Sequence, residues 1–253
     1  MWRIRPAGAG ARLGALALVV VLATGLAAML AGSRTAPPSP ATDIPLAAVP
    51  RLDRPLRLAV MGTSLSARYR WPQALAAKLS SCLPQPVVLS VFAEPGVGSA
   101  WAAGVVEKVA RFAPDLVLIE FLANDSDLRQ MRSVSGSRAT HRGLIQALRA
   151  GGSNPAIALM TMNPAFGLRG LMRPRLGAFE AMYAELAREM GTGLIDVAAR
   201  WRDRLRTADH AALLPDGLHP TDAAATGMML RAVVPAVAAA LAGAWPACAS
   251  LEP

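Results

Sequence analysis

Hydrophobic residues are grouped along this chain into short continuous runs that alternate with longer segments of helical spacing. The short runs are rich in Val, Leu and Ile, and they lie at 56–61, 87–92, 116–121, 156–162 and 194–197. Apolar residues recur with helical spacing at 71–80, 100–112, 138–150, 178–190 and 222–241. Near-continuous apolar runs are typical of strands that are buried on both faces of a parallel sheet. Five strands that alternate with five helices predict one doubly wound α/β domain with a five-stranded, mainly parallel sheet.

The N-terminal segment differs from the rest of the chain because it is long, apolar and uncharged. Three arginines precede residues 13–32, and these twenty residues carry no charge. At about 1.5 Å per residue, a helix of this length would cross the hydrocarbon core of a bilayer, which is about 30 Å thick. Residues 1–33 are therefore predicted to be a signal anchor or a cleaved signal peptide, for which Ala31-Gly32-Ser33 offers a small-residue cleavage site. Either form would export the body to the periplasmic or extracytoplasmic side, and the uncleaved form would anchor it to the inner membrane.

A proline-rich stretch at residues 34–54 follows the apolar segment. Its five prolines disfavour a helix or a central strand. The stretch is predicted to be an extended linker that holds the folded domain, residues 55–253, away from a membrane.

The composition describes a chain that can bury a large core. Of the 253 residues, 53% are apolar and 17% are charged, which excludes a disordered chain, a coiled coil and a collagen-like fibre. The net charge of +9 is divided between the two parts of the chain, with +4 up to residue 54 and +5 in the remainder. Because no basic run is interleaved with aromatic residues, nucleic-acid binding is not predicted.

The chain contains two cysteines, Cys82 and Cys248. Export would place them in an oxidising compartment, which permits a disulfide between them. Two buried free thiols are the alternative.

Candidate catalytic residues stand where predicted strands or loops meet helices. Gly62-Thr63-Ser64 directly follows the first predicted strand, and Asp216 and His219 precede the last predicted helix. In doubly wound sheets the ligand site lies at the carboxyl ends of the strands. A catalytic serine needs a base, and the base needs a carboxylate that fixes its tautomer. Ser64, His219 and Asp216 are therefore candidates for nucleophile, base and orienting acid, although a serine at this position is also typical of an ordinary turn or N-cap.

Two further strand ends carry groups that could donate hydrogen bonds to an oxyanion. Gly96 and Gly98 follow the second strand and would let an oxyanion approach backbone N–H groups. Asn124 follows the third strand and offers a side-chain amide. A plain turn before an N-cap at Ser99 would also explain the glycines, and an Asx-turn would explain Asn124. Their coincidence with the serine and the Asp/His pair at successive strand ends indicates a hydrolase site.

Four segments resemble the sequence blocks of the SGNH/GDSL hydrolases, in the order typical of that family. They are Gly62-Thr63-Ser64-Leu65, Gly96, Ala123-Asn124-Asp125 and Asp216-Gly217-Leu218-His219. The resemblance implies a flavodoxin-like three-layer sandwich that hydrolyses acyl esters without a metal or an organic cofactor. It also implies that Ser64 is the nucleophile, His219 the base and Asp216 its orienting partner. The oxyanion hole implied by the resemblance consists of the N–H groups of Ser64 and Gly96 and the Asn124 amide.

Two residues depart from the blocks of this family. Thr63 stands where the family usually has Asp, and Leu122 stands where the third block normally has Gly. Neither change removes a catalytic group, but Leu122 could narrow the cleft or shift Asn124. Gly98 is the alternative to Gly96 as the glycine of the second block.

An arginine-rich stretch at residues 163–176 follows the fourth predicted strand and is expected to overhang the site. Arg169 and Arg173 are candidates for binding an anionic or polyhydroxyl substrate, since guanidinium groups pair with carboxylates. A solvated basic loop is the alternative. Trp71 and Trp101 could stack on a sugar, although the packing of helix faces is the simpler explanation.

The two histidines outside the fourth block, His141 and His210, are predicted to be solvated surface residues. No cluster of His, Cys and carboxylate residues has zinc spacing, and no nucleotide-binding glycine motif is complete. A metal or nucleotide cofactor is therefore not predicted.

These observations predict an exported serine esterase that acts on short acyl esters, acetyl above all, of an envelope or extracellular glycan or lipid. An O-acyltransferase in polysaccharide assembly would use the same acyl-enzyme on Ser64. A catalytically silent, membrane-tethered glycan-binding module is the third interpretation. The sequence does not indicate an oligomeric state.

Overall fold

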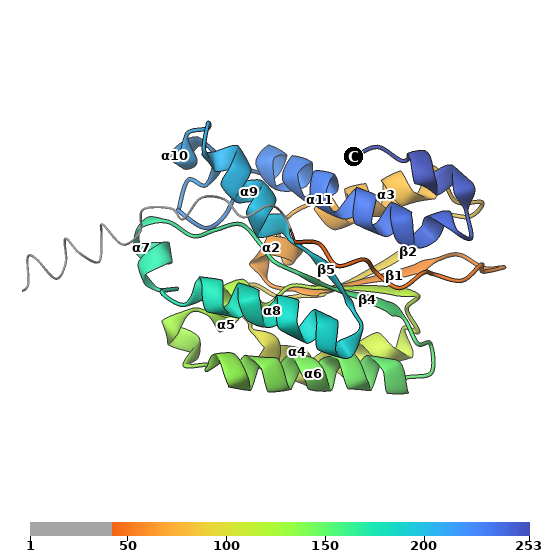
Figure 1. Cartoon of the computed structure of the whole chain (residues 1–253), viewed down its shortest axis with the longest axis horizontal. Helices are drawn as coiled ribbons and strands as arrows, with labels where there is room; N and C mark the ends of the chain where they lie inside the picture. Colours follow the sequence, from red (N-terminus) through yellow and green to blue (C-terminus); the bar gives the residue numbers. More distant parts are fainter. Residues whose placement is uncertain (1–41) are drawn as a thin grey trace, which may run out of the picture. The chain divides into compact units, whose positions relative to one another are not determined.

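A computed structural model of this protein describes residues 42–253. The apolar segment predicted at 1–33 and residues 34–41 of the predicted linker lie outside the described residues. The described part of the chain forms a central sheet with helices on both faces (Figure 1).

Five parallel strands form the sheet, in the order β2-β1-β3-β4-β5. The strands are β1 (Arg57–Gly62), β2 (Val88–Ala93), β3 (Leu116–Ile119), β4 (Ala156–Met160) and β5 (Gly193–Ile195). Every residue of β3 and β4 is buried, which explains their continuous apolar sequences. The strand order is that of a flavodoxin-like doubly wound sheet, so the predicted fold class is confirmed.

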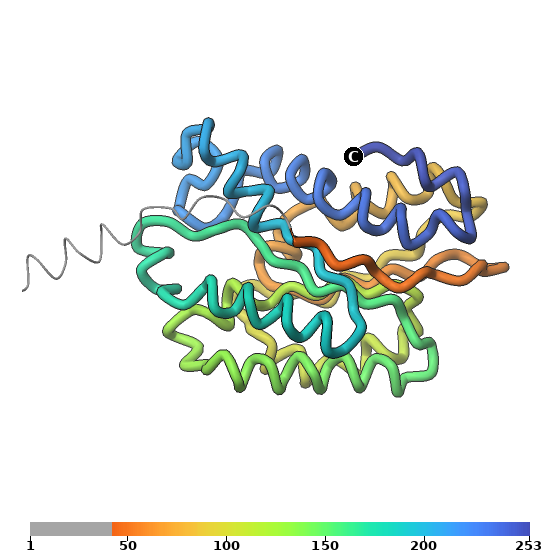
Figure 2. The backbone as a smooth tube through the Cα atoms, viewed as in Figure 1, coloured from red at the N-terminus to blue at the C-terminus, as the bar shows by residue number. Residues whose placement is uncertain are grey.

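Helices cover both faces of the sheet and enclose two apolar cores (Figures 1 and 2). One face carries α4 (Ser99–Arg111), α6 (Val134–Ala150) and α8 (Leu176–Met190), and the other carries α3 (Trp71–Ser80), α9 (Val197–Leu205) and α11 (Asp222–Ala242). Short helices complete the structure: α2 (Ser64–Ala67), α5 (Leu122–Asp125), η1 (Leu128–Gln130), α7 (Gly167–Leu171), α10 (His210–Leu213) and η2 (Pro246–Ser250). Successive residues of β1 face opposite cores, because side chains alternate along a strand.

The five predicted strands and the five predicted long helices are all present. The helix α9 was not predicted, because the apolar run at 194–197 suggested a single strand. In the structure β5 ends at Ile195, and Asp196 caps the helix by accepting a hydrogen bond from the Ala199 N–H at 3.1 Å. Val197 is therefore the first residue of α9 rather than the last residue of a strand.

Residues 42–54, predicted as the end of a linker, are extended but lie along the folded body. Ile44 pairs with Leu194 of β5 through two backbone hydrogen bonds of 2.9 Å. Leu46 and Val49 are buried in the core, and the Val49 N–H donates to the Ala240 carbonyl at 2.9 Å. These apolar residues cover the otherwise open edge of β5, so the packed body begins before residue 55.

The two cysteines form a disulfide. It joins Cys82, just after α3, to Cys248 in η2. The bond therefore ties the C-terminal end of the described chain to the first half of the fold.

The helix α11 is the one helix among residues 42–253 that is long and apolar enough to cross a membrane, with a mean hydropathy of 1.6. It packs against α3 and α9, and its buried face includes Met229, Val233 and Val237. It is a core helix of the domain.

Candidate active site

Ser64 stands at the carboxyl edge of the sheet, where β1 ends and α2 begins. Thr63 caps the short helix, because its hydroxyl accepts a hydrogen bond from the Leu65 N–H at 3.2 Å. A serine at such a strand-to-helix turn presents its hydroxyl at the edge of the sheet.

Ser64, His219 and Asp216 lie together, although 155 positions separate the serine from the histidine. The Ser64 Oγ lies 3.0 Å from the His219 Nε2, and the His219 Nδ1 lies 2.8 Å from the Asp216 Oδ2. Because the carboxylate accepts a hydrogen bond from Nδ1–H, Nε2 is left to accept the proton of the hydroxyl. This is the geometry that a nucleophile, its base and an orienting acid require.

Asp216 is held by backbone donors as well as by the imidazole. The N–H groups of Leu218 and His219 donate to its Oδ1 at 2.9 and 2.7 Å. Burial raises the pKa of Asp216, but the hydrogen bonds from the His219 side chain and from these N–H groups outweigh it and hold the pKa well below its ordinary value. Asp216 is therefore an ionised partner for the imidazole at neutral pH.

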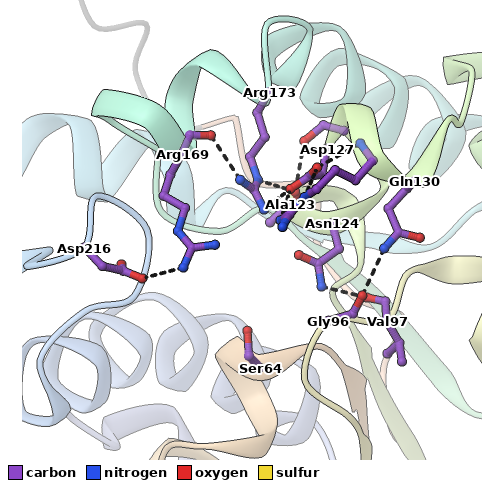
Figure 3. A network of polar contacts seen from close by, with 12 residues as sticks. Ser64, Gly96, Val97, Ala123, Asn124, Asp127, Gln130, Arg169, Arg173 and Asp216 are labelled. Atoms are coloured by element: carbon purple, nitrogen blue, oxygen red, sulfur yellow. Dashed lines mark hydrogen bonds and ion pairs between the residues drawn. The ribbon is translucent and has the colours of Figure 1, made fainter.

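Asn124 in α5 lies on the opposite side of Ser64 from Asp216, as Figure 3 shows. Its Nδ2 donates to the Val97 carbonyl at 2.7 Å. This bond uses one of the two N–H groups of the amide, so the other can serve a ligand at Ser64.

The two candidate glycines of the loop after β2 have different surroundings. Gly96 is exposed, and its carbonyl accepts a hydrogen bond from the Gln130 side chain at 3.0 Å. Gly98 is buried at the start of α4, where a Cβ would collide with the Asp125 carboxylate. The same carboxylate accepts a hydrogen bond from the Ser99 N–H at 2.8 Å, which fixes the start of α4 against α5.

The two candidate arginines of the stretch after β4 also differ (Figure 3). Arg169 is half-buried, and its Nη2 donates to the Asp216 Oδ2 at 3.1 Å. Arg173 is buried and forms an ion pair with Asp127 at 2.8 Å. It also donates to the carbonyls of Ala123 and Arg169 at 2.7 and 3.0 Å. Arg169 thus borders the site, whereas Arg173 joins α7 to α5 instead of making the substrate contact expected from the sequence.

Glu120, which was not predicted as a site residue, directly follows β3 and lies next to the turn that carries Ser64. Its carboxylate accepts hydrogen bonds from the Thr63 N–H at 2.6 Å, from the Thr63 hydroxyl at 3.0 Å and from the Ser66 hydroxyl at 2.7 Å. Gly62 is required at this point, because a Cβ there would collide with the same carboxylate. Glu120 therefore binds the residues on both sides of the serine, Thr63 through its backbone and hydroxyl and Ser66 through its hydroxyl.

The environment of Glu120 changes its acidity. Burial raises its pKa to about 7, although the hydrogen bonds from Thr63 and Ser66 act in the opposite direction. The signal in the sequence was a single charged residue inside the otherwise apolar run at 116–121.

The remaining two histidines have structural partners. His141, predicted to be solvated, is fully buried between α6 and α8, with its Nε2 2.8 Å from the Tyr183 hydroxyl and its Nδ1 2.9 Å from the Ser137 carbonyl. That prediction was wrong because His141 lies on the core face of its helix. His210 is exposed, as predicted, and its ring packs on Phe166 at 4.5 Å. Among residues 42–253, no group of three His, Cys, Asp or Glu residues could hold a metal ion.

The two candidate tryptophans pack inside the fold. Trp71 is fully buried, and its Nε1 donates to the Leu65 carbonyl at 2.9 Å. The ring of Trp101 packs against Phe121, with 6.4 Å between the ring centres. Helix packing, the simpler explanation, therefore holds for both.

Comparison with known sequences identifies one family. The sequence model of the GDSL-like lipase/acylhydrolase family matches residues 59–226, a stretch that contains the serine, the Asp/His pair and both oxyanion candidates. Among curated proteins no relative matches the chain.

Solved structures of esterases share the fold. A catalytic mutant of an acetylxylan esterase from Geobacillus stearothermophilus matches with a TM-score of 0.59 and 20% identity, over 72% of this chain and 96% of its own. LAE5, an alpha/beta hydrolase from the metagenome of Lake Arreo in Spain, gives a TM-score of 0.63 and 20% identity, over 72% and 94%. A lipase/acylhydrolase from Enterococcus faecalis gives 0.58 and 20%, over 70% and 94%.

Proposed function

Since this chain belongs to the GDSL-like lipase/acylhydrolase family and is an ester hydrolase, we propose that it is a serine esterase that forms an acyl-enzyme on Ser64. The observation that carries this proposal is the chain of contacts from the Ser64 hydroxyl through His219 to Asp216, at 3.0 and 2.8 Å.

Acylation begins when the Ser64 Oγ attacks the ester carbonyl carbon. The His219 Nε2 takes the hydroxyl proton as the new C–O bond forms, and the ionised Asp216 stabilises the imidazolium. When the tetrahedral intermediate collapses, the bond to the alcohol breaks, and His219 returns the proton to the alcohol oxygen.

Three donors are proposed to stabilise the oxyanion: the N–H groups of Ser64 and Gly96, and the Nδ2 of Asn124. Gly96 is favoured over Gly98 because it is exposed in the loop after β2, whereas the Val97 carbonyl points at Asn124 and the N–H of Gly98, in the same trans peptide, points the other way. The loop that carries Gly96 is held in place by the hydrogen bond from Asn124 to the Val97 carbonyl. Donors held rigidly before the reaction need no reorganisation when the charge develops.

Deacylation repeats the same proton transfers with water. His219 takes a proton from a water molecule as the water oxygen attacks the acyl carbon. When the bond between the acyl carbon and the Ser64 oxygen breaks, His219 returns the proton to that oxygen. The acid leaves, and the free hydroxyl is restored.

The acyl group is proposed to be short, acetyl above all, and the alcohol to belong to an envelope or extracellular glycan. The acetylxylan esterase neighbour supports an acetylated glycan as the substrate class.

The uncharged segment at 13–32 and the disulfide support the proposal that the protein is exported. A periplasmic or extracytoplasmic location would give the site access to envelope glycans.

The test is the hydrolysis of p-nitrophenyl acetate by the full-length protein. Ser64→Ala and His219→Ala are each expected to lower kcat by about 10³-fold or more, because they remove the nucleophile and the base. Ser135→Ala removes an exposed hydroxyl on α6 and is the matched control with unchanged kcat. Unchanged rates in both site variants would show that the reaction occurs elsewhere.

The product identifies the acceptor of the acyl group. With acetylated xylooligosaccharide as donor and excess deacetylated oligosaccharide present, free acetate is the expected main product. Accumulation of newly acetylated acceptor would instead identify an O-acyltransferase. Binding of the oligosaccharide with no turnover would identify a glycan-binding module.

A further inference from the structure

Exposed apolar side chains gather on two segments beside the site. Among residues 42–253, the exposed large apolar side chains are Leu128 (55%), Met131 (92%), Leu168 (75%), Leu171 (64%) and Val88 (43%). All except Val88 lie on η1, at its C-terminal end or on α7, and we call these four residues the rim patch. Single exposed apolar residues are common on protein surfaces, but four on neighbouring segments indicate an interaction surface.

The rim patch borders the proposed active site. The Leu128 N–H donates to the Met172 carbonyl at 2.9 Å, which joins η1 to the end of α7. In Figure 2 the green segment near residue 130 and the teal segment near residue 170 lie at the same end of the tube. Between the two leucines of α7, Arg169 reaches Asp216 of the triad. A surface that held this patch would therefore lie beside the triad.

The segments that carry the rim patch are strongly basic. Residues 127–135 and 165–175 together contain five arginines and one acidic residue, Asp127. That aspartate is buried and paired with Arg129 and Arg173. Exposed leucine and methionine among arginines are typical of surfaces that lie in the interface of a bilayer with anionic lipids.

The described chain begins at the carboxyl ends of the strands, the edge of the sheet where the proposed active site lies. Thr42 donates its N–H and its hydroxyl to the Asp196 Oδ2, both at 3.3 Å, and Asp196 directly follows β5. The uncharged run ends at Gly32, ten positions earlier. A fully extended chain of ten residues reaches about 35 Å, whereas a folded body of this size is about 40 Å across. With residues 13–32 as the predicted anchor, Thr42 would lie within about 35 Å of the membrane surface, at the edge of the sheet that also carries the active site and the rim patch.

We propose that the rim patch docks on the surface of an anionic phospholipid bilayer. Its apolar side chains enter the boundary between headgroups and acyl chains, and the exposed side chains of Arg129 and Arg175 contact lipid phosphates. The inference rests on the proposed function, because it takes the chain to be an exported and anchored esterase. Docking would present Ser64 to ester groups of glycans or lipids held at the membrane surface.

The experiment places an environment-sensitive fluorophore on the patch of the full-length protein. Leu171→Cys is labelled with NBD, while Cys82 and Cys248 stay in their disulfide. The matched control is Val88→Cys, which is also exposed but begins β2 at the opposite edge of the sheet. In nanodiscs of phosphatidylcholine and phosphatidylglycerol, the label at 171 is expected to be at least about twofold brighter than in detergent-free buffer and to be quenched by doxyl-labelled lipid. The label at 88 is expected to show neither change.

Two changes test the chemistry of the docking. Zwitterionic nanodiscs or high salt should weaken the signal at 171, because the arginines then lose their lipid partners or are screened. With the label moved to Met131→Cys, the double substitution Leu168→Gln and Leu171→Gln should abolish the quenching. The same double variant should hydrolyse p-nitrophenyl acetate at the rate of the parent, so a failure of docking is distinguishable from a failure of the esterase proposal.

Three results would overturn the proposal. The first is an equal response of the labels at 171 and 88 to lipid. The second is a change at 171 that needs no lipid and follows self-association, which would identify a second copy of the chain as the occupant. The third is a change at 171 only with a soluble long-chain ester, which would identify the substrate's acyl chain.

Discussion

Thr63 departs from the aspartate usual in the first block of the family, and Glu120 explains how the serine is nevertheless held in place. The carboxylate that fixes the turn comes from the end of β3 rather than from the turn itself. It binds the backbone N–H and the hydroxyl of Thr63 on one side of the nucleophile and the hydroxyl of Ser66 on the other. Thr63 still performs the capping role, because its hydroxyl also accepts from the Leu65 N–H.

Glu120 is expected to make the stability of the protein depend on pH. Burial raises the pKa of Glu120 from its ordinary value of 4.5 to about 7, so the folded protein binds the proton more tightly than the unfolded chain does. The contribution of this group to the free energy of unfolding therefore falls as the pH rises from about 4.5 to about 7, and the loss is complete above that range. Glu120→Gln should lack this part of the pH dependence in urea denaturation at pH 5 and pH 8.

Glu107→Gln is the matched control for that measurement. Glu107 lies on α4 with its side chain 88% exposed, so its substitution should leave the pH dependence of the parent unchanged. Identical pH dependence in the parent and in Glu120→Gln would contradict the expected role of the buried carboxyl.

Asn124 is expected to stabilise the transition state of the reaction rather than the folded protein. Asn124→Ala removes one proposed oxyanion donor, so kcat for p-nitrophenyl acetate should fall by about 10²- to 10³-fold. The measurement pairs steady-state kinetics with thermal unfolding, which should show a folded protein. A kcat close to that of the parent would exclude the amide from the oxyanion hole.

At the scale of elements, the sequence predicted the strands and long helices because each of them has a strong local pattern. Short helices such as α5 and α7 were not predicted, since four or five residues carry no readable periodicity. The serine and the Asp/His pair could be proposed from the sequence because Ser64 closely follows a strand and Asp216 and His219 closely precede a helix. The partners of Arg173 could not be predicted in the same way. Its ion pair is with Asp127, 46 positions earlier in the chain, and depends on how α7 packs against α5.

Arg173 is expected to stabilise the contact between α7 and α5. Arg173→Met leaves Asp127 buried without this ion pair, so the free energy of unfolding should fall by about 3 kcal/mol. Arg169→Gln removes a single contact to Asp216 from a side chain that is 38% exposed, so it should cost less than about 1 kcal/mol. Urea denaturation of both variants measures the difference, and equal losses would contradict the distinct roles of the two arginines.

At the scale of the whole molecule, both ends of the described chain pack against distant parts of the fold. Residues 42–54 cover β5, and the last residues of the described chain reach back to the end of α3 through the disulfide. Residues 42–54 are extended, but extended chain can line a sheet edge as well as span a gap. The spacing of Ile44, Leu46 and Val49 was the sign that it packs, and only the fold shows which edge it covers.

The disulfide is expected to support stability without supporting catalysis. It closes a loop of 166 positions, and in the chain-entropy model such a bond contributes about 5 kcal/mol by restricting the unfolded chain. The double variant Cys82→Ser and Cys248→Ser should lose about this free energy of unfolding and should no longer respond to reducing agent. Its kcat should equal that of the parent under conditions where it is folded, because Cys82 lies near the start of β2, at the edge of the sheet opposite Ser64. A variant that stays as stable as the parent would show that the packing of η2 alone holds the C-terminal end. A lower kcat in the fully folded variant would show that the disulfide also influences the edge of the sheet that carries Ser64.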